Sequence, residues 1–199
     1  IKKGFSENDF LLSDDFIMVC DEFNKGKKTS PFQNSGIMIG DRVYTVKTIP
    51  QYDGPYKTLS QHLIPDNKVP EEYFIDKKSL EKWKYLKGAK KEKRINKNAG
   101  FEYNYAEGAM VFPDALDKPS RTIITGEGGP SPSRFKHVVK CKNGKLRRLT
   151  PVELERLNMF PDNHTEGVPD VNRAFIMGNA LVTGVIEKIG KELYKRIAK

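Results

Sequence analysis

Two cysteines are the side chains of this sequence best suited to nucleophilic chemistry. Cys141 lies between Lys140 and Lys142, and nearby cations favour the reactive thiolate form. Cys20 has no cation beside it. The two cysteines and three histidines match neither a disulfide framework nor the usual zinc-ligand spacings. We therefore expect a reducing compartment and no metal site.

A glycine-rich loop, residues 126–134, separates two segments rich in β-branched residues, 121–125 and 135–141, which we predict to be strands. A dinucleotide-binding loop would need Gly at Ser131, and a P-loop would end in Lys-Ser or Lys-Thr, so nucleotide binding is disfavoured. The loop instead suits DNA, because Arg pairs with guanine, Ser and Thr bind phosphates, and Gly permits close approach of the backbone. A solvated hairpin tip is the alternative.

The net charge of +9 favours a polyanionic partner. Nearly all of this excess lies in residues 77–97, which hold ten basic and two acidic side chains around Trp83 and Tyr85. This block fits a phosphate-tracking surface and a merely solvated face equally well.

Helix-capping residues begin a short helix predicted over residues 151–159. Thr150 is the N-cap, Pro151 takes the first helical position, and Glu153 completes a capping box. Further along, Gly178 and Asn179 precede a helix predicted over residues 180–197, with Asn179 as its N-cap. A helix N-terminus presents unpaired amide donors, which could contact a ligand there.

The order and spacing of these segments resemble the carboxyl-terminal part of the DNA (cytosine-5) methyltransferases. Residues 148–161, Arg-Leu-Thr-Pro-Val-Glu-Leu-Glu-Arg-Leu-Asn-Met-Phe-Pro, are similar to the ninth conserved motif of that family. Residues 177–182, Met-Gly-Asn-Ala-Leu-Val, are similar to the tenth. The segment from residue 119 to 139 is similar to the recognition segment before the ninth motif in bacterial members. The likeness is strong over residues 101–189 and weak over 31–94.

The resemblance implies roles for specific residues. It implies contact with S-adenosyl-L-methionine by Gly178, Asn179 and Ala180. It implies a structural role, in the ninth motif, for Arg148, Thr150, Pro151 and Glu153. It implies contact with double-stranded DNA by Arg121, Thr122, Ile123, Ser131, Ser133, Arg134 and Lys136.

The catalytic motifs of that family are missing from this sequence. The family's attacking cysteine lies in Pro-Cys-Gln and its general acid in Glu-Asn-Val, and neither tripeptide occurs here. We therefore reject Cys20 and Cys141 as nucleophiles and expect no catalytic residue. Because the sequence begins with Ile1, we expect part of a longer or divided protein, with the catalytic part as a partner. The alternative is a stand-alone DNA-binding module or specificity subunit; an RNA-modifying relative is disfavoured.

The predicted fold is α+β. Residues 1–30 are a linker or residual N-terminal strands, residues 31–145 a small, mostly β target-recognition domain, and residues 146–199 a short helix followed by a strap and a long helix. We also expect a hairpin over residues 36–46 and helices near 58–63 and 79–91, the latter fraying at Gly88. No apolar run approaches the ~20 residues of a membrane span, so we expect a cytoplasmic protein.

Overall fold

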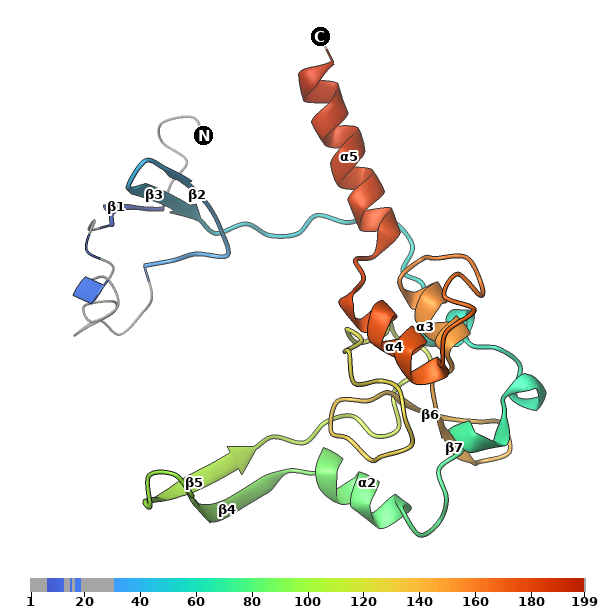
Figure 1. The fold of residues 1–199 in the computed structure, drawn as a ribbon. Coiled ribbons are helices and arrows are strands. Elements are labelled where there is room, and N and C mark those ends of the chain that lie inside the picture. Colours follow the sequence, from blue (N-terminus) through green and yellow to red (C-terminus); the bar gives the residue numbers. More distant parts are fainter. Residues whose placement is uncertain (1–6, 13–14, 16, 19–30, 199) are drawn as a thin grey trace. The chain divides into compact units, whose positions relative to one another are not determined.

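The structure, a computed structural model, describes residues 7–12, 15, 17–18 and 31–198. Cys20 lies outside this part. The chain divides into two units, residues 1–55 and residues 56–199, and we describe each by itself (Figure 1). Small antiparallel sheets and helices make up the described residues, so the predicted α+β class is confirmed. The predicted boundaries at residues 30 and 145 stay a prediction.

The described part of the first unit holds a three-stranded antiparallel sheet in the order β1-β3-β2. Its strands are β1 (Asn8–Leu11), β2 (Ser35–Ile39) and β3 (Arg42–Val46). β2 and β3 form the predicted hairpin. Gly40 in its turn has a φ of +56°, which glycine adopts without the steric penalty of a side chain.

The second unit starts with short helical turns and one α-helix. The turns are the 3-10 helices η1 (Leu59–His62), η2 (Asp66–Lys68) and η3 (Glu71–Tyr73). The helix α2 (Leu80–Lys87) ends at Gly88, where fraying was expected, and buries Trp83. The lysine-rich residues after it form β4 (Lys90–Ile95), which pairs with β5 (Glu102–Glu107) in a hairpin that the sequence analysis did not predict.

The strand predicted over residues 121–125 is wrong. Residues 121–124 have no regular secondary structure, and no strand of the described residues pairs with them; Ile123 is instead buried in the core. The strand predicted over 135–141 is shorter than expected and pairs with an unpredicted one. These two strands are β6 (Val138–Lys140) and β7 (Leu146–Arg148).

Three helices end the described chain: α3 (Pro151–Leu157), α4 (Asp170–Asn179) and α5 (Thr183–Ile197). α3 is the helix predicted at 151–159. The start predicted for the last helix is wrong, because α4 ends at Asn179, Ala180 has extended backbone (φ −76°, ψ 149°), and α5 begins three residues later than expected. The core beneath them is formed by Leu59, Ile123, Val139, Leu149, Leu154, Ala174 and Met177. Within the described residues, every helix is too short or too polar to cross a membrane.

Candidate functional site

The start of α3 has the predicted capping geometry. The Thr150 hydroxyl accepts a hydrogen bond from the Glu153 amide at 3.4 Å, and the Thr150 amide donates to Glu153 Oε2 at 2.8 Å. Pro151 occupies the first turn, where no intrahelical amide partner is required. The local capping pattern is therefore confirmed.

The carboxylate of Glu153 also makes a buried ion pair that the sequence analysis missed. Arg147, not Arg148, donates two hydrogen bonds to it, at 2.9 and 2.8 Å, and both residues are fully buried. The Ile64 amide donates to the same carboxylate at 2.9 Å. Arg148 turns away, donating to the Glu72 carbonyl at 2.6 Å. The alternation of side chains along β7 is the signal that only one of two adjacent arginines faces α3.

A second buried carboxylate, Glu155, joins α3 to α4. It accepts hydrogen bonds from the amides of Asn163 and Thr165, at 2.7 and 3.0 Å, and from Arg173 at 2.8 Å. Burial raises the pKa of Glu155, but the hydrogen bonds from Arg173 and Thr165 outweigh burial and hold the pKa below its usual range. Neither Glu155 nor Arg173 has a role predicted from the sequence.

The basic residues predicted to contact DNA have partners within the chain. Arg121 donates to Asp114 at 2.7 Å and to the Phe135 carbonyl at 3.2 Å. Arg134 donates to Glu107 at 3.0 Å, and also to the Gly108 carbonyl. These contacts fix both arginines to neighbouring segments of the protein.

Lys136 closes the glycine-rich loop from inside. Its ammonium donates to the carbonyls of Gly129 and Ser131, both at 2.9 Å, and its side chain is buried. Burial lowers the pKa of Lys136. At the base of the loop, the buried Glu127 carboxylate accepts hydrogen bonds from the His137 ring at 2.8 Å and from its amide at 3.0 Å. The loop is thus held in one shape, with Ser131 exposed at its tip.

Two glycines allow the glycine-rich loop and the segment before it to lie directly on α4. A Cβ placed on Gly128 would come 2.9 Å from Cα of Val171 in α4. A Cβ placed on Gly178 would come 2.3 Å from the backbone nitrogen of Thr125. Ordinary Cβ contacts begin near 3.4 Å, so any larger residue at Gly178 must push the crossing backbone away.

The strap segment, residues 178–182, differs from the expectation. Asn179 is the last residue of α4, not an N-cap, and its side-chain amide donates to the Phe175 carbonyl one turn earlier at 3.0 Å. The break after it is held by Asn158, whose side chain donates to the Met177 carbonyl at 2.7 Å and whose carbonyl accepts from the Thr183 amide at 3.0 Å. Asn179 remains exposed to solvent.

A cleft of about 420 Å³ joins the two sets of predicted site residues. Arg121, Thr122 and Ile123 line one part of it, and the strap residues Gly178 and Ala180 line another. Asn179 and the tip of the glycine-rich loop are not among its lining residues. Residues 121–123 and the strap are more than 50 positions apart in sequence, and the core that seats residue 123 on α4 brings them together.

Comparison with known proteins identifies the family. The family model for C-5 cytosine-specific DNA methylases matches residues 17–195. The chain belongs to the C-5 cytosine-specific DNA methylase family. It is 40% identical over 184 residues to the type II methyltransferase M.Sau3AI of Staphylococcus aureus, covering 92% of this chain and 42% of that relative. The chain thus spans less than half the length of this relative.

The solved structure of the Dnmt2 methyltransferase of S. pombe resembles this methylase chain in fold. It aligns with a TM-score of 0.50 at 13% identity, covering 79% of this chain and 51% of that one. At this level of identity, the likeness extends to the fold alone.

The last helix of this methylase chain leaves an apolar stripe uncovered. α5 buries none of its residues, and its apolar side chains are between 44% and 69% exposed. They are Val185, Ile186, Ile189, Leu193, Tyr194 and Ile197. Large exposed apolar patches in proteins often belong to interaction sites.

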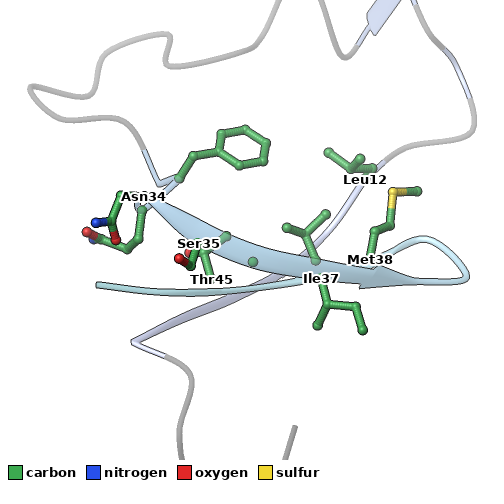
Figure 2. A pocket seen from close by; sticks show the side chains of 10 residues that line it. Leu12, Asn34, Ser35, Ile37, Met38 and Thr45 are labelled. Atoms are coloured by element: carbon green, nitrogen blue, oxygen red, sulfur yellow. The ribbon is translucent and has the colours of Figure 1, made fainter. Parts of the chain in front are cut away.

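A further hollow, of about 330 Å³, lies on the sheet of the first unit (Figure 2). Leu12, Ile37 and Met38 are among its apolar side chains, and Asn34 and Ser35 are among its polar ones. The side chains of Asn34 and Ser35 each form a hydrogen bond with Thr48, at 2.7 Å in both cases. The predicted site residues do not line this hollow.

Proposed function

We propose that this chain reads the DNA target and completes the cofactor pocket of a cytosine-5 DNA methyltransferase of restriction-modification type. The main support for the proposal is that α4 is a shared platform for two segments. The backbone of the recognition segment packs directly on α4 at Gly128 and Gly178, and the end of α4 leads into the strap. Target reading and cofactor closure therefore depend on one helix. The methyl group passes from S-adenosyl-L-methionine to C5 of a cytosine flipped out of the duplex.

The residues predicted to contact DNA fall into two groups. Thr122 and Ser131 are exposed, and with Ser133 they offer hydroxyls to bases or phosphates. Arg121, Arg134 and Lys136 have their donors engaged within the chain, so we assign them to positioning the loop. Ile123 anchors the segment in the core.

The strap could contact one side of S-adenosyl-L-methionine. The side-chain oxygen of the exposed Asn179 and the backbone of Gly178 and Ala180 are the polar groups that the strap offers. Among the described residues lining the cleft there is no Asp or Glu to bind the ribose hydroxyls. The remaining contacts would come from the catalytic part, and the stripe on α5 is the surface we assign to docking against it.

The reactive cysteine would also come from the catalytic part. Burial and the hydrogen bond with Asp66 raise the pKa of the Cys141 thiol, which disfavours the thiolate. Cys141 is also only 6% exposed, which leaves little room for a cytosine base to reach its sulfur. We accordingly assign no catalytic residue to the described part of this chain.

The DNA-reading half of the proposal is tested by selection from a randomised duplex library, followed by titration of the enriched duplex by fluorescence anisotropy. Thr122→Ala, Ser131→Ala and Ser133→Ala should each weaken binding, and a variant that removes a base contact should lose about 1–3 kcal/mol of preference at one position. Ser60→Ala, an exposed serine outside the loop, is the control. Failure of the wild-type chain to enrich any sequence would contradict target reading.

A further inference from the structure

The hairpin of β4 and β5 is a two-stranded sheet that no third strand of the described residues extends (Figure 1). A hairpin of this kind is at best marginally stable alone, so other contacts must hold its shape. Side chains alternate between its faces, and residues directly opposite each other share a face. The side chains of β4 therefore divide between the two faces, with Lys90, Glu92 and Arg94 on one and Lys91, Lys93 and Ile95 on the other.

The root of the hairpin is tied to the glycine-rich loop. The Glu107 carboxylate, at the end of β5, accepts hydrogen bonds from Lys90 at 2.9 Å and from Arg134 at 3.0 Å. Arg134 also donates to the carbonyl of Gly88, just before β4, at 3.4 Å. Because Arg134 is the last residue of the glycine-rich loop, these contacts fix the hairpin to the loop that is predicted to contact DNA.

The rest of the face that carries Lys90 is also occupied by internal contacts. The Glu92 carboxylate accepts a hydrogen bond from Arg94 at 2.8 Å. The Arg94 guanidinium lies over the Tyr105 ring, 3.4 Å from its centre, a cation–π contact that braces the two strands. Two cations and two carboxylates of the hairpin thus balance on this face, and it offers little charge to a ligand.

The opposite face carries positive charge that is not balanced in this way. Lys91 is exposed and makes no ion pair within the part of the chain that the structure describes. Lys93 is 77% exposed, and its ammonium lies 3.8 Å from Glu102; so exposed a pair contributes little. Lys97 in the turn is exposed and likewise has no ion pair with any described residue. Three ammonium groups therefore meet one carboxylate here.

The turn that carries Lys97 has a defined shape. The Asn96 side chain accepts hydrogen bonds from the amides of Asn98 and Ala99, at 3.0 and 3.1 Å. Gly100 closes the turn with a φ of +70°, which a residue with a side chain rarely adopts. The third lysine is consequently held at the end of the same two strands.

We propose that the hairpin binds the phosphate backbone of duplex DNA beside the target site, through Lys91, Lys93 and Lys97. This inference rests on the proposed function, because Arg134 joins the hairpin to the loop that is taken to read the target. Lysine ammonium groups displace counterions from phosphates without selecting a base, so the hairpin adds affinity and the loop adds selectivity. A two-stranded ribbon also fits the width of the DNA major groove.

Duplex DNA is favoured over a single-stranded nucleic acid by the position of the aromatic rings. Proteins that bind single strands stack bases on aromatic side chains beside their basic residues. In this hairpin Tyr103 and Tyr105 lie on the face opposite Lys91 and Lys93, and Phe101 packs against Tyr103. The lysine face of the two strands therefore offers charge without a stacking platform.

The test is a salt titration of the full chain with the enriched duplex and with an unselected duplex. The triple variant Lys91→Ala, Lys93→Ala and Lys97→Ala should reduce the slope of log K against log salt by about 0.9 for each lost phosphate contact, about 2.7 in all. The reduction should be the same on both duplexes, because phosphates carry no sequence. Arginine at the same three positions keeps the charge and should preserve the slope.

The matched control removes three exposed lysines that lie outside the hairpin. It is the triple variant Lys47→Ala, Lys68→Ala and Lys142→Ala, which has the same change in net charge. This variant should leave the slope unchanged. All the substituted side chains are exposed, so urea unfolding should give the same stability for every variant.

The outcomes distinguish this inference from the function it rests on. An unchanged slope in the hairpin variant, or an equal reduction in the control, would overturn the phosphate contact and leave target reading intact. Tighter binding of a single-stranded RNA than of duplex DNA, lost in the hairpin variant, would assign the lysines to RNA and overturn it too. A wild type that enriches no sequence, but whose slope on the unselected duplex falls in the hairpin variant, would contradict target reading and support the phosphate contact. No binding of any duplex by the wild type would overturn both.

Discussion

Replacing Gly178 by alanine tests whether α4 is the platform for the recognition segment. The new Cβ would lie 2.3 Å from Thr125 N and 2.4 Å from Ile124 C, whereas ordinary contacts begin near 3.4 Å. The crossing backbone must therefore retreat by about 1 Å, the difference between these distances. Overpacking of this kind typically costs about 1–3 kcal/mol, and a backbone obstacle places it in the upper half of that range.

The helix itself prefers alanine, so the net effect of Gly178→Ala combines two terms. Alanine gains at most about 1 kcal/mol over glycine inside a helix, and less at a helix end. We expect a net loss of about 2 kcal/mol, which lowers Tm by about 4–8 °C for a chain of this size. Calorimetry and urea unfolding measure it, and DNA affinity should fall with it.

Gly190→Ala is the matched control, because Gly190 is also helical and a Cβ there meets nothing within 4 Å. This variant should gain about 1 kcal/mol. If Gly178→Ala were as stable as the wild type, or gained stability as Gly190→Ala does, residues 124–125 would not lie against α4 and the platform would be refuted.

Three further predictions concern buried charge. Glu153→Gln removes the nearer counter-charge of the buried Arg147 guanidinium and leaves only Asp66, whose Oδ1 is 3.9 Å from Nε, so it should cost about 3–5 kcal/mol in urea unfolding. The pKa of Glu155 is lower in the folded state than its usual value of 4.5, so ionised Glu155 stabilises the fold above pH 4.5, and this stabilisation is lost as the pH falls through the folded-state pKa. Arg173→Met should move the loss to higher pH in an acid titration of Tm. Burial lowers the pKa of Lys87 to about 8 from 10.5, so the unfolded state binds more protons between these values and stability should rise with pH there. Lys87→Met should reduce this rise, with a smaller part left because burial also lowers the pKa of Lys136, whereas an unchanged profile would contradict the prediction.

Sequence reasoning succeeded where the signal was local. The capping of α3 depends on Thr150, Pro151 and Glu153 within one turn, and each has the expected contact. The hairpin of β2 and β3 was found from its glycine-containing turn between two β-branched runs. Such patterns are decided by neighbouring residues, so they can be read before the fold is known.

The wrong predictions concern residues whose structure depends on packing against segments distant in the sequence. The run at residues 121–125 has strong β propensity, but its side chains are used to pack on α4 and it has no partner strand. Asn179 was taken as an N-cap because asparagine is common there, yet the same residue ends α4. The partners of Arg121, Arg134 and Lys136 lie in other segments, so their internal roles could not be inferred from composition.

The central claim is that this chain supplies recognition and pocket closure while the reactive thiol lies on another part of the enzyme. The most direct measurement is transfer of a labelled methyl group from S-adenosyl-L-methionine to the enriched duplex. We expect no transfer by the chain alone, and transfer at C5 of cytosine when it is mixed with the complementary catalytic part of a family member. Methylation of DNA by this chain alone would contradict the account.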